Sequence, residues 1–226
     1  MCYVWSSRGY DGSTKLDKEV TVVATNDYHF ITTWRIKSTI EEVSEIIGDP
    51  RGLTSWWPSV YLDVKVLEEG DERGLGRVVS LYTKGWLPYT LRWDFRVTEV
   101  RPNGFTLVAW GDFDGRGIWI FEQDGEWVHV TYDWKIKAEK PLLRYFSFVM
   151  KPIFSANHRW AMAKGEESLK LEIARRHTAN LEELTHIPAP PRATPSSPVP
   201  LLLATTTIFA LLIGVFYIVV RLLSRD

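Results

Sequence analysis

The sequence predicts an α+β fold in which a curved antiparallel sheet wraps one long C-terminal helix, with a single membrane-spanning helix after it. Apolar and polar residues alternate in several runs between residues 28 and 136, which is the period of strands with one buried face. The alternation ends near residue 141, where apolar residues begin to recur every three or four positions, as in an amphipathic helix. No charged residue occurs in 193–220, and its apolar part has the length of a membrane span.

The alternating region begins with one strand, which two short helices follow. One face of the strand would carry Tyr28, Phe30, Thr32, Trp34 and Ile36. Ser38 or Thr39 is expected to cap the first short helix, because a hydroxyl is followed there by acidic residues in the first turn. That helix should end near residues 48–50, and a second short helix or turn should run to 55–58.

Six strands of an antiparallel meander are expected next. Turn-forming residues separate them at 68–72, 85–88, 102–104, 111–115 and 124–125. The pair Asp124-Gly125 is a strong hairpin signal. Alternation is clearest in the strand that contains Tyr89, Leu91, Trp93, Phe95 and Val97. In the strand after residue 58, the same rule puts Val60, Leu62, Val64 and Val66 on the buried face and Tyr61 on the other.

The long C-terminal helix is expected over about residues 141–184. Pro152 should kink it or split it into two, because proline removes a backbone donor. Beyond Pro152 the apolar stripe contains Phe154, His158, Ala161, Met162, Gly165, Leu169 and Ile173. Gly165 lacks a side chain within this stripe, so it marks either a close backbone contact or empty space.

The remaining segments divide the chain further. Residues 1–26 are polar and read as a flexible N-terminal segment. Residues 186–200 are rich in proline and predict an extended linker that spans at most about 40 Å. Residues 201–220 would be about 30 Å long as a helix, which matches the hydrocarbon thickness of a bilayer, and we expect a transmembrane helix over 201–223.

The orientation of this span is argued from two features. The N-terminus lacks the charged and apolar pattern of a signal peptide, which favours a tail-anchored, single-pass protein with its folded domain in the cytoplasm. Arg221 and Arg225 oppose this, since basic residues tend to stay on the cytoplasmic side.

Composition excludes several classes of function. With 27 basic and 28 acidic residues, the chain has no basic footprint for nucleic acid. A single cysteine excludes an intrachain disulfide framework and a cysteine-based zinc cluster. The five histidines show no metal-ligand spacing, and no phosphate-binding or serine-hydrolase motif occurs. We therefore expect no metal and no cofactor. The 11 tryptophans instead indicate a large core or a lined cavity.

Four motifs, taken with the order of elements, resemble a known group. They are Ser-Trp-Trp-Pro at 55–58, Leu-Pro-Tyr-Thr-Leu-Arg-Trp at 87–93, Gly-Asp-Phe-Asp-Gly-Arg-Gly at 111–117 and Asn-His-Arg-Trp-Ala-Met at 157–162. The sequence is similar to the START-like (SRPBCC) superfamily, in particular its polyketide cyclase/dehydrase and lipid-transport family. The resemblance covers about residues 28–173 and implies a helix-grip fold over 27–185 with an apolar cavity. The membrane anchor departs from the usual pattern of the family.

The inward strand faces and the long helix should supply the wall of such a cavity. The candidate ligand-binding residues are Trp34, Trp57, Tyr89, Trp93, Phe95, Tyr132, Trp134, Phe154, His158 and Met162. For each of them, plain core packing is the alternative. Trp56 and Trp57 are expected beside the mouth, either as a gate or membrane-touching lid, or as a structural plug.

Three functions follow from this reading. The first is a membrane-anchored domain that binds or transfers a hydrophobic small molecule or lipid. The second is a polyketide cyclase/dehydratase-type enzyme, with His158 and a pocket tyrosine such as Tyr89 as the acid/base pair. The third is a structural or partner-binding role with a filled cavity. The sequence names no protein partner.

Overall fold

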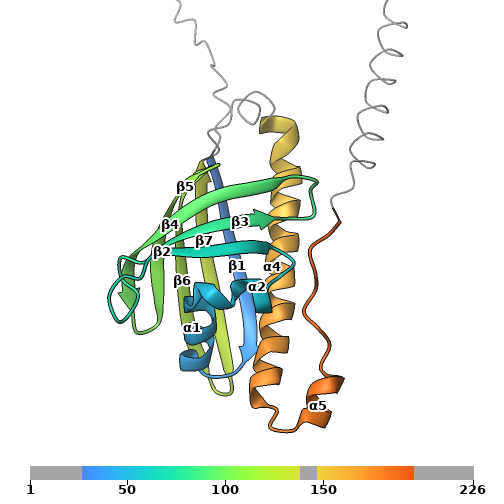
Figure 1. The fold of residues 1–226 in the computed structure, drawn as a ribbon. Helices are drawn as coiled ribbons and strands as arrows, with labels where there is room; N and C mark the ends of the chain where they lie inside the picture. The colour runs from blue at the N-terminus through green and yellow to red at the C-terminus, as the bar shows by residue number, and fades with distance from the viewer. Residues whose placement is uncertain (1–26, 138–146, 196–226) are drawn as a thin grey trace, which may run out of the picture.

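The computed structural model describes residues 27–137 and 147–195, which form a seven-stranded sheet and helices (Figure 1). The elements in chain order are β1 Asp27–Lys37, α1 Ile40–Gly48, a 3₁₀ turn Pro50–Gly52, α2 Leu53–Trp56, β2 Tyr61–Glu68, β3 Val78–Lys84, β4 Thr90–Arg101, β5 Gly104–Gly111, β6 Asp114–Asp124, β7 Trp127–Lys137, α4 Ser147–His177 and α5 Leu181–His186. This order confirms the predicted strand, short helices, six-strand meander and long helix.

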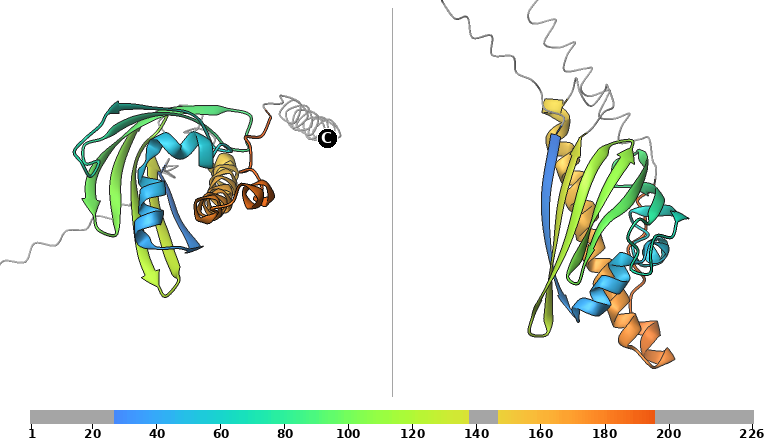
Figure 2. Two further views of the ribbon diagram at one scale, coloured as in Figure 1. Left: turned by 60° about the horizontal axis from the view of Figure 1, so that its bottom comes forward. Right: turned by 90° about the vertical axis from the view of Figure 1, so that its left-hand side faces the viewer.

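All neighbouring strands of the sheet are antiparallel, in the order β1-β7-β6-β5-β4-β3-β2. The first strand therefore pairs with the last, with Trp34 opposite Val130. Figure 2 shows the sheet curling around α1, α2 and α4, so that its concave face looks onto the helices. This arrangement is the expected helix-grip fold.

Alternation of apolar and polar residues determines which face of β1 and β7 is buried. Trp34 and Ile36 of β1 are buried, as are Val128, Val130 and Tyr132 of β7. Thr39 caps α1, because its hydroxyl accepts a hydrogen bond from the backbone N–H of Glu42 at 3.3 Å. The apolar face of α1 then packs into the core.

A β-bulge makes β2 differ from its expected pattern. The register with β3 shifts between Tyr61 and Asp63, so Leu62 is an extra residue without a partner. The shift leaves the side chain of Leu62 38% exposed, while Tyr61 is packed against the core. The prediction that Leu62 is buried and Tyr61 faces outward is therefore wrong, because simple alternation does not survive an inserted residue.

The C-terminal helix is one continuous element through Pro152, and it ends earlier than expected. Of the kink or split expected at Pro152, the split does not occur, because α4 continues through this residue; the segment before Ser147 lies outside the described residues. The predicted end near residue 184 is also wrong. Helix α4 stops at His177, and Asn180 begins α5 by accepting a hydrogen bond from the N–H of Glu182 at 2.9 Å.

Residues 187–195, the C-terminal strap, run back along α4 (Figure 1). The guanidinium of Arg175 donates to the carbonyl of Pro188. At the other end of the strap, the Thr194 hydroxyl donates to the carbonyl of Gly85 at 3.3 Å, and Lys84 Nζ donates to the Thr194 carbonyl. The described part of the expected spacer is thus attached to the domain, and its residues 196–200 lie outside the described residues.

The predictions for residues 1–26 and 201–223 lie outside the described residues. Within residues 27–137 and 147–195, no helix is both long enough and apolar enough to cross a bilayer.

Candidate functional site

An internal cavity of about 350 Å³ lies between the concave face of the sheet, α2 and α4. Aromatic side chains dominate its wall: Trp56, Trp57, Tyr61, Trp93, Phe95, Phe105, Trp119, Phe121 and Tyr132. Aliphatic side chains complete it: Ile47, Leu53, Leu81, Val97, Val100, Leu107 and Met162. A concave, mostly apolar site of this size suits a small hydrophobic ligand.

Trp57 forms one end of the wall and is fixed by its neighbours. Its ring centroid lies 5.6 Å from that of Trp34, 5.3 Å from that of Trp56 and 5.2 Å from that of Tyr61. The indole lies directly on Gly165 of α4, where an added Cβ would be 2.3 Å from Trp57 Cζ2. Gly165 is therefore a close-contact glycine, and the 3% exposed Trp57 is a structural wall rather than an exposed gate or lid.

The sheet side of the cavity is a stack of aromatic rings. The rings of Trp119 and Tyr132 are stacked with centroids 4.0 Å apart, and Trp134 stacks behind Tyr132 at 5.6 Å. Gly117 makes room for this stack, because a Cβ there would lie 2.7 Å from the hydroxyl of Tyr132. The indole N–H of Trp93 donates to the buried Thr83 hydroxyl at 3.0 Å. These contacts hold the ring planes in place.

Few polar groups reach this space. Burial raises the pKa of both Tyr61 and Tyr132, so both phenols are neutral at neutral pH and can donate a hydrogen bond. Within the described residues, neither hydroxyl has a hydrogen-bond partner. The indole N–H groups of Trp56 and Trp57 are also buried without a partner in this part of the chain. The cavity wall is thus apolar, with a small surplus of donors.

The mouth of the cavity lies between α1, the β2–β3 loop (residues 69–77) and the β4–β5 hairpin. Its rim residues are Glu41, Ser44, Glu45, Arg73, Arg77 and Pro102. Arg77 ties two sides of the rim together, because its guanidinium donates to the carbonyl of Gly48 at 3.0 Å and to that of Glu69 at 3.1 Å. The end of α1 is thereby fixed to the loop.

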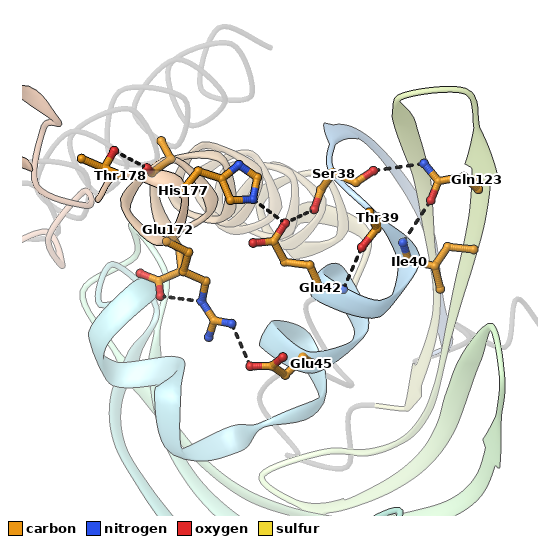
Figure 3. Close-up of polar contacts among 11 residues, drawn as sticks. Ser38, Thr39, Ile40, Glu42, Glu45, Gln123, Glu172, His177 and Thr178 are labelled. Atoms are coloured by element: carbon orange, nitrogen blue, oxygen red, sulfur yellow. Dashed lines mark hydrogen bonds and ion pairs between the residues drawn. The ribbon is translucent and has the colours of Figure 1, made fainter. Parts of the chain in front are cut away.

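The start of α1 is fixed to the C-terminal end of α4 (Figure 3). Arg176 donates to Glu45 of α1 at 2.8 Å and to Glu172 at 3.2 Å. The imidazole of His177 lies 3.0 Å from the carboxylate of Glu42. These ion pairs connect α1, at the mouth of the cavity, to the end of α4.

The structure separates the predicted ligand-binding residues into three groups. Trp57, Trp93, Phe95, Tyr132 and Met162 line the cavity. Trp34 and Trp134 pack behind the lining, through ring contacts to Trp57 and Tyr132, respectively.

The third group lies elsewhere. Phe154 and His158, in the N-terminal half of α4, face β1, and Tyr89 packs against Phe154. The Phe154 ring contacts those of Tyr28 and Tyr89 at about 6 Å. The structure therefore does not place these three residues among the cavity-lining side chains.

His158 is packed in this second aromatic cluster. Its imidazole stacks on Phe30 with centroids 4.2 Å apart, and its Nε2 lies 3.4 Å from the Thr32 hydroxyl. Burial, with a smaller effect of the Arg159 charge, lowers the pKa of His158 to about 4. The imidazole is therefore neutral at neutral pH, and it is partly buried against Phe30 of β1.

Sequence reasoning misses several residues of the cavity. Alternation assigns Tyr61 to the outer face, and only the bulge at Leu62 turns it inward. Trp119 and Phe121 lie in the apolar run 118–121, where Ile118 and Ile120 are apolar too, so alternation does not show which face is buried. The rim pair Arg73 and Arg77 gives no sequence signal, because both lie in a turn.

The fold is shared with solved structures of low sequence identity. A protein from Thermus thermophilus has a TM-score of 0.58 at 16% identity, covering 67% of this chain and 100% of that one. The Zhui aromatase/cyclase from Streptomyces sp. R1128 has a TM-score of 0.55 at 18% identity, covering 68% and 97%. A START superfamily protein from Mycobacterium smegmatis has a TM-score of 0.50 at 11% identity, covering 66% and 98%.

The sequence matches no protein-family model and no curated protein. At such low identities the structural likeness establishes the fold alone. The described residues thus adopt the helix-grip architecture found in START-superfamily and aromatase/cyclase proteins, built around an apolar cavity.

Proposed function

We propose that this protein binds or transfers a hydrophobic small molecule or lipid in its internal cavity while it is anchored to a membrane. The observation that carries the binding part is the aromatic cavity of about 350 Å³ under the sheet. Its wall would bury an apolar ligand at roughly 25 cal/mol per Å² of apolar surface removed from water. That is a favourable term for a molecule with little polarity of its own.

The unpartnered donors in the wall define the ligand further. Trp56 and Trp57 line the cavity, and each has a buried indole N–H without a partner among the described residues. The neutral hydroxyls of Tyr61 and Tyr132 are further donors in the wall. A buried donor without a partner costs about 1–3 kcal/mol. A ligand with one or two acceptor oxygens on an apolar body would remove that cost, so we propose this chemistry for it.

Binding is favoured over catalysis by the position of the titratable groups. The enzyme alternative needs an acid/base pair beside the ligand, and His158 and Tyr89 do not line the cavity. The phenols that do line it have raised pKa values, which makes them donors rather than bases. Aromatase/cyclase activity belongs to the Zhui protein, and its fold alone does not transfer that activity to this chain.

A matched pair of variants on one strand tests the binding. Leu107 lines the cavity, whereas its neighbour Val108 points outward and is 41% exposed. Full-length protein in phosphatidylcholine nanodiscs is titrated with 2-naphthol by calorimetry, with empty nanodiscs as the blank. We expect one site per chain, lost in Leu107→Trp and kept in Val108→Trp. Equal binding by both variants would refute the cavity as the site.

The anchoring part of the proposal is supported by the sequence of residues 201–220, which lie outside the described residues. This run is long enough to cross the hydrocarbon core and contains no charge. We propose a cytoplasmic orientation for the folded domain.

Extraction of membranes with alkaline carbonate tests the anchor. The wild-type chain should stay in the pellet, and Leu211→Arg should shift it toward the supernatant, because a charge near the helix centre costs about 2.5–3.5 kcal/mol. Release of the wild-type chain by carbonate would show that the segment does not span a bilayer.

A further inference from the structure

We propose that the β3–β4 loop (residues 85–89) rests on a lipid bilayer, with the cavity mouth turned toward the water. This inference depends on the proposed membrane anchor and adds to it a specific contact surface. It is carried by the side chains of the loop, by the attachment of the C-terminal strap, and by the positions of the loop and the mouth along β3 and β4.

The loop presents aromatic side chains to the outside on a firm base. Trp86 is 41% exposed, and Tyr89 is 37% exposed although one side of its ring contacts Phe154 of α4. Gly85 is pressed against Asn157 of α4, where an added Cβ would lie 2.1 Å from Asn157 Oδ1. The same oxygen accepts a hydrogen bond from the N–H of Leu87 at 3.3 Å. Tryptophan and tyrosine prefer the interfacial layer of a bilayer, because each combines a large apolar ring with one polar group.

The C-terminal strap brings the chain out of the domain beside this loop. Thr194 is hydrogen-bonded to Gly85 through its hydroxyl and to Lys84 through its carbonyl. Residues 196–200 are all that separates the strap from the apolar run that starts at Leu201. From Thr194 to Leu201 the chain makes seven Cα-to-Cα steps, which reach at most about 25 Å when fully extended. If residues 201–220 cross a bilayer, the loop can therefore lie no farther than about that distance from the start of the span.

The cavity mouth lies at the opposite ends of the same strands. Arg77 of the rim directly precedes β3, and the strap is attached at Lys84, the last residue of β3. At about 3.3 Å per residue, β3 alone separates these two sites by about 20 Å. In Figure 1, α1 lies at the lower left of the domain and the end of the strap at its upper right. With the loop on lipid, ligand would exchange through the aqueous side.

The alternatives to lipid as the partner of this loop surface are another segment of this chain and a second copy of the chain. The shortness of residues 196–200 favours lipid, because that connection holds the loop near the bilayer whatever else the chain does. A lipid contact also differs from a protein contact in which small reagents can reach the loop. Lipid admits oxygen and excludes charged or polar metal complexes, whereas a protein contact excludes both.

Spin labelling of the full-length chain tests the proposal. Cys2 is the only cysteine, so Cys2→Ser permits a single nitroxide at Trp86→Cys. The matched control is Leu75→Cys, which is 38% exposed on the β2–β3 loop near the mouth. Each labelled protein is held in phosphatidylcholine liposomes, and its collisions with oxygen and with nickel-ethylenediaminediacetate are measured by electron paramagnetic resonance. Thermal unfolding and 2-naphthol binding verify that each variant is folded.

We expect the label at residue 86 to collide several-fold less with the nickel complex, and more with oxygen, than the label at residue 75. Equal collision rates at the two sites would overturn the proposal, as would a label at residue 86 that is shielded from both reagents, since that indicates a protein contact. Release of the wild-type chain by carbonate would refute the proposed membrane anchor. An anchored chain whose label at residue 86 remains in water would refute only the contact between the loop and the bilayer.

Discussion

The indole of Trp57 lies on the backbone of Gly165, and this contact sets how closely α4 approaches the short helix α2. A Cβ at residue 165 would come within 2.3 Å of Trp57 Cζ2 and 2.6 Å of Cε2. Trp57 is itself part of the cavity wall. The width of the cavity at this point is therefore linked to the absence of a side chain in α4.

Replacement of Gly165 by alanine should destabilise the protein. Alanine is favoured over glycine inside a helix by about 1 kcal/mol, but overpacking of a core costs about 1–3 kcal/mol. We expect a net loss of up to about 2 kcal/mol in the free energy of unfolding, measured by denaturant titration. Gly48→Ala is the control, because nothing lies within 4 Å of its added Cβ. Equal stability changes in the two variants would contradict the close contact.

His158 should make stability depend on pH. Its pKa is about 4 in the folded state and about 6.5 when unfolded, so the unfolded chain binds the proton more tightly. The contribution is complete above about pH 6.5 and is lost progressively as the pH falls toward 4, by about 3 kcal/mol in all at 1.36 kcal/mol per unit. Denaturant titrations between pH 7 and pH 4.5 measure this slope.

The matched variants for this slope are His158→Gln and His129→Gln. His129 is an exposed residue of β7 with 45% of its side chain accessible. We expect His158→Gln to flatten the dependence on pH while His129→Gln retains it. A slope that survives in His158→Gln would show that this histidine is not the group responsible.

Arg176 should control how quickly ligand leaves the cavity. It connects α1 to α4 through Glu45 and Glu172. Arg176→Met should lower stability by only about 0.5–1 kcal/mol, as is usual for exposed ion pairs, but it should speed the dissociation of 2-naphthol in stopped-flow measurements. Lys164→Met is the control, because its ion pair with Glu167 stays within α4. Identical dissociation rates in both variants would argue against α1 as the moving part.

Thr83 should be needed to hold the ring of Trp93 in the wall. Thr83→Val keeps the shape of the side chain but removes the acceptor of the Trp93 N–H, which lies 3.0 Å away. Loss of a buried partner should lower the free energy of unfolding by about 1–2 kcal/mol. The outward-facing Thr98, whose hydroxyl bonds to the carbonyl of Thr106 at 3.4 Å, supplies a control in Thr98→Val, with an expected change below about 0.5 kcal/mol.

Strand alternation and helical spacing predict most of the fold, because each depends on which face of an element is buried. The faces of β1 and β7 and the stripe of Met162, Leu169 and Ile173 are as the pattern indicates. The failures are local. The bulge at Leu62 reverses two side chains, and Asn180 starts a new helix where continuous helix is expected. Neither event changes the hydrophobic period enough to be seen in sequence.

The sequence predicts that an apolar cavity exists, but it predicts only some of the residues that line it. Trp93, Phe95 and Tyr132 follow from strand faces, and Met162 follows from the helix stripe. His158 lies on that same stripe but outside the cavity wall, because Phe30 of the edge strand β1 covers it. A periodic pattern tells which side of α4 is buried, but the part that lines a cavity depends on how far each strand reaches over the helix.

Native mass spectrometry of the full-length chain, purified in nanodiscs without added ligand, tests the central claim most directly. The account predicts that the wild-type chain and Val108→Trp carry the added mass of one apolar small molecule, released on collisional activation, and that Leu107→Trp lacks it. A wild-type chain at its bare mass, or the same added mass on Leu107→Trp, would contradict a ligand held in the cavity.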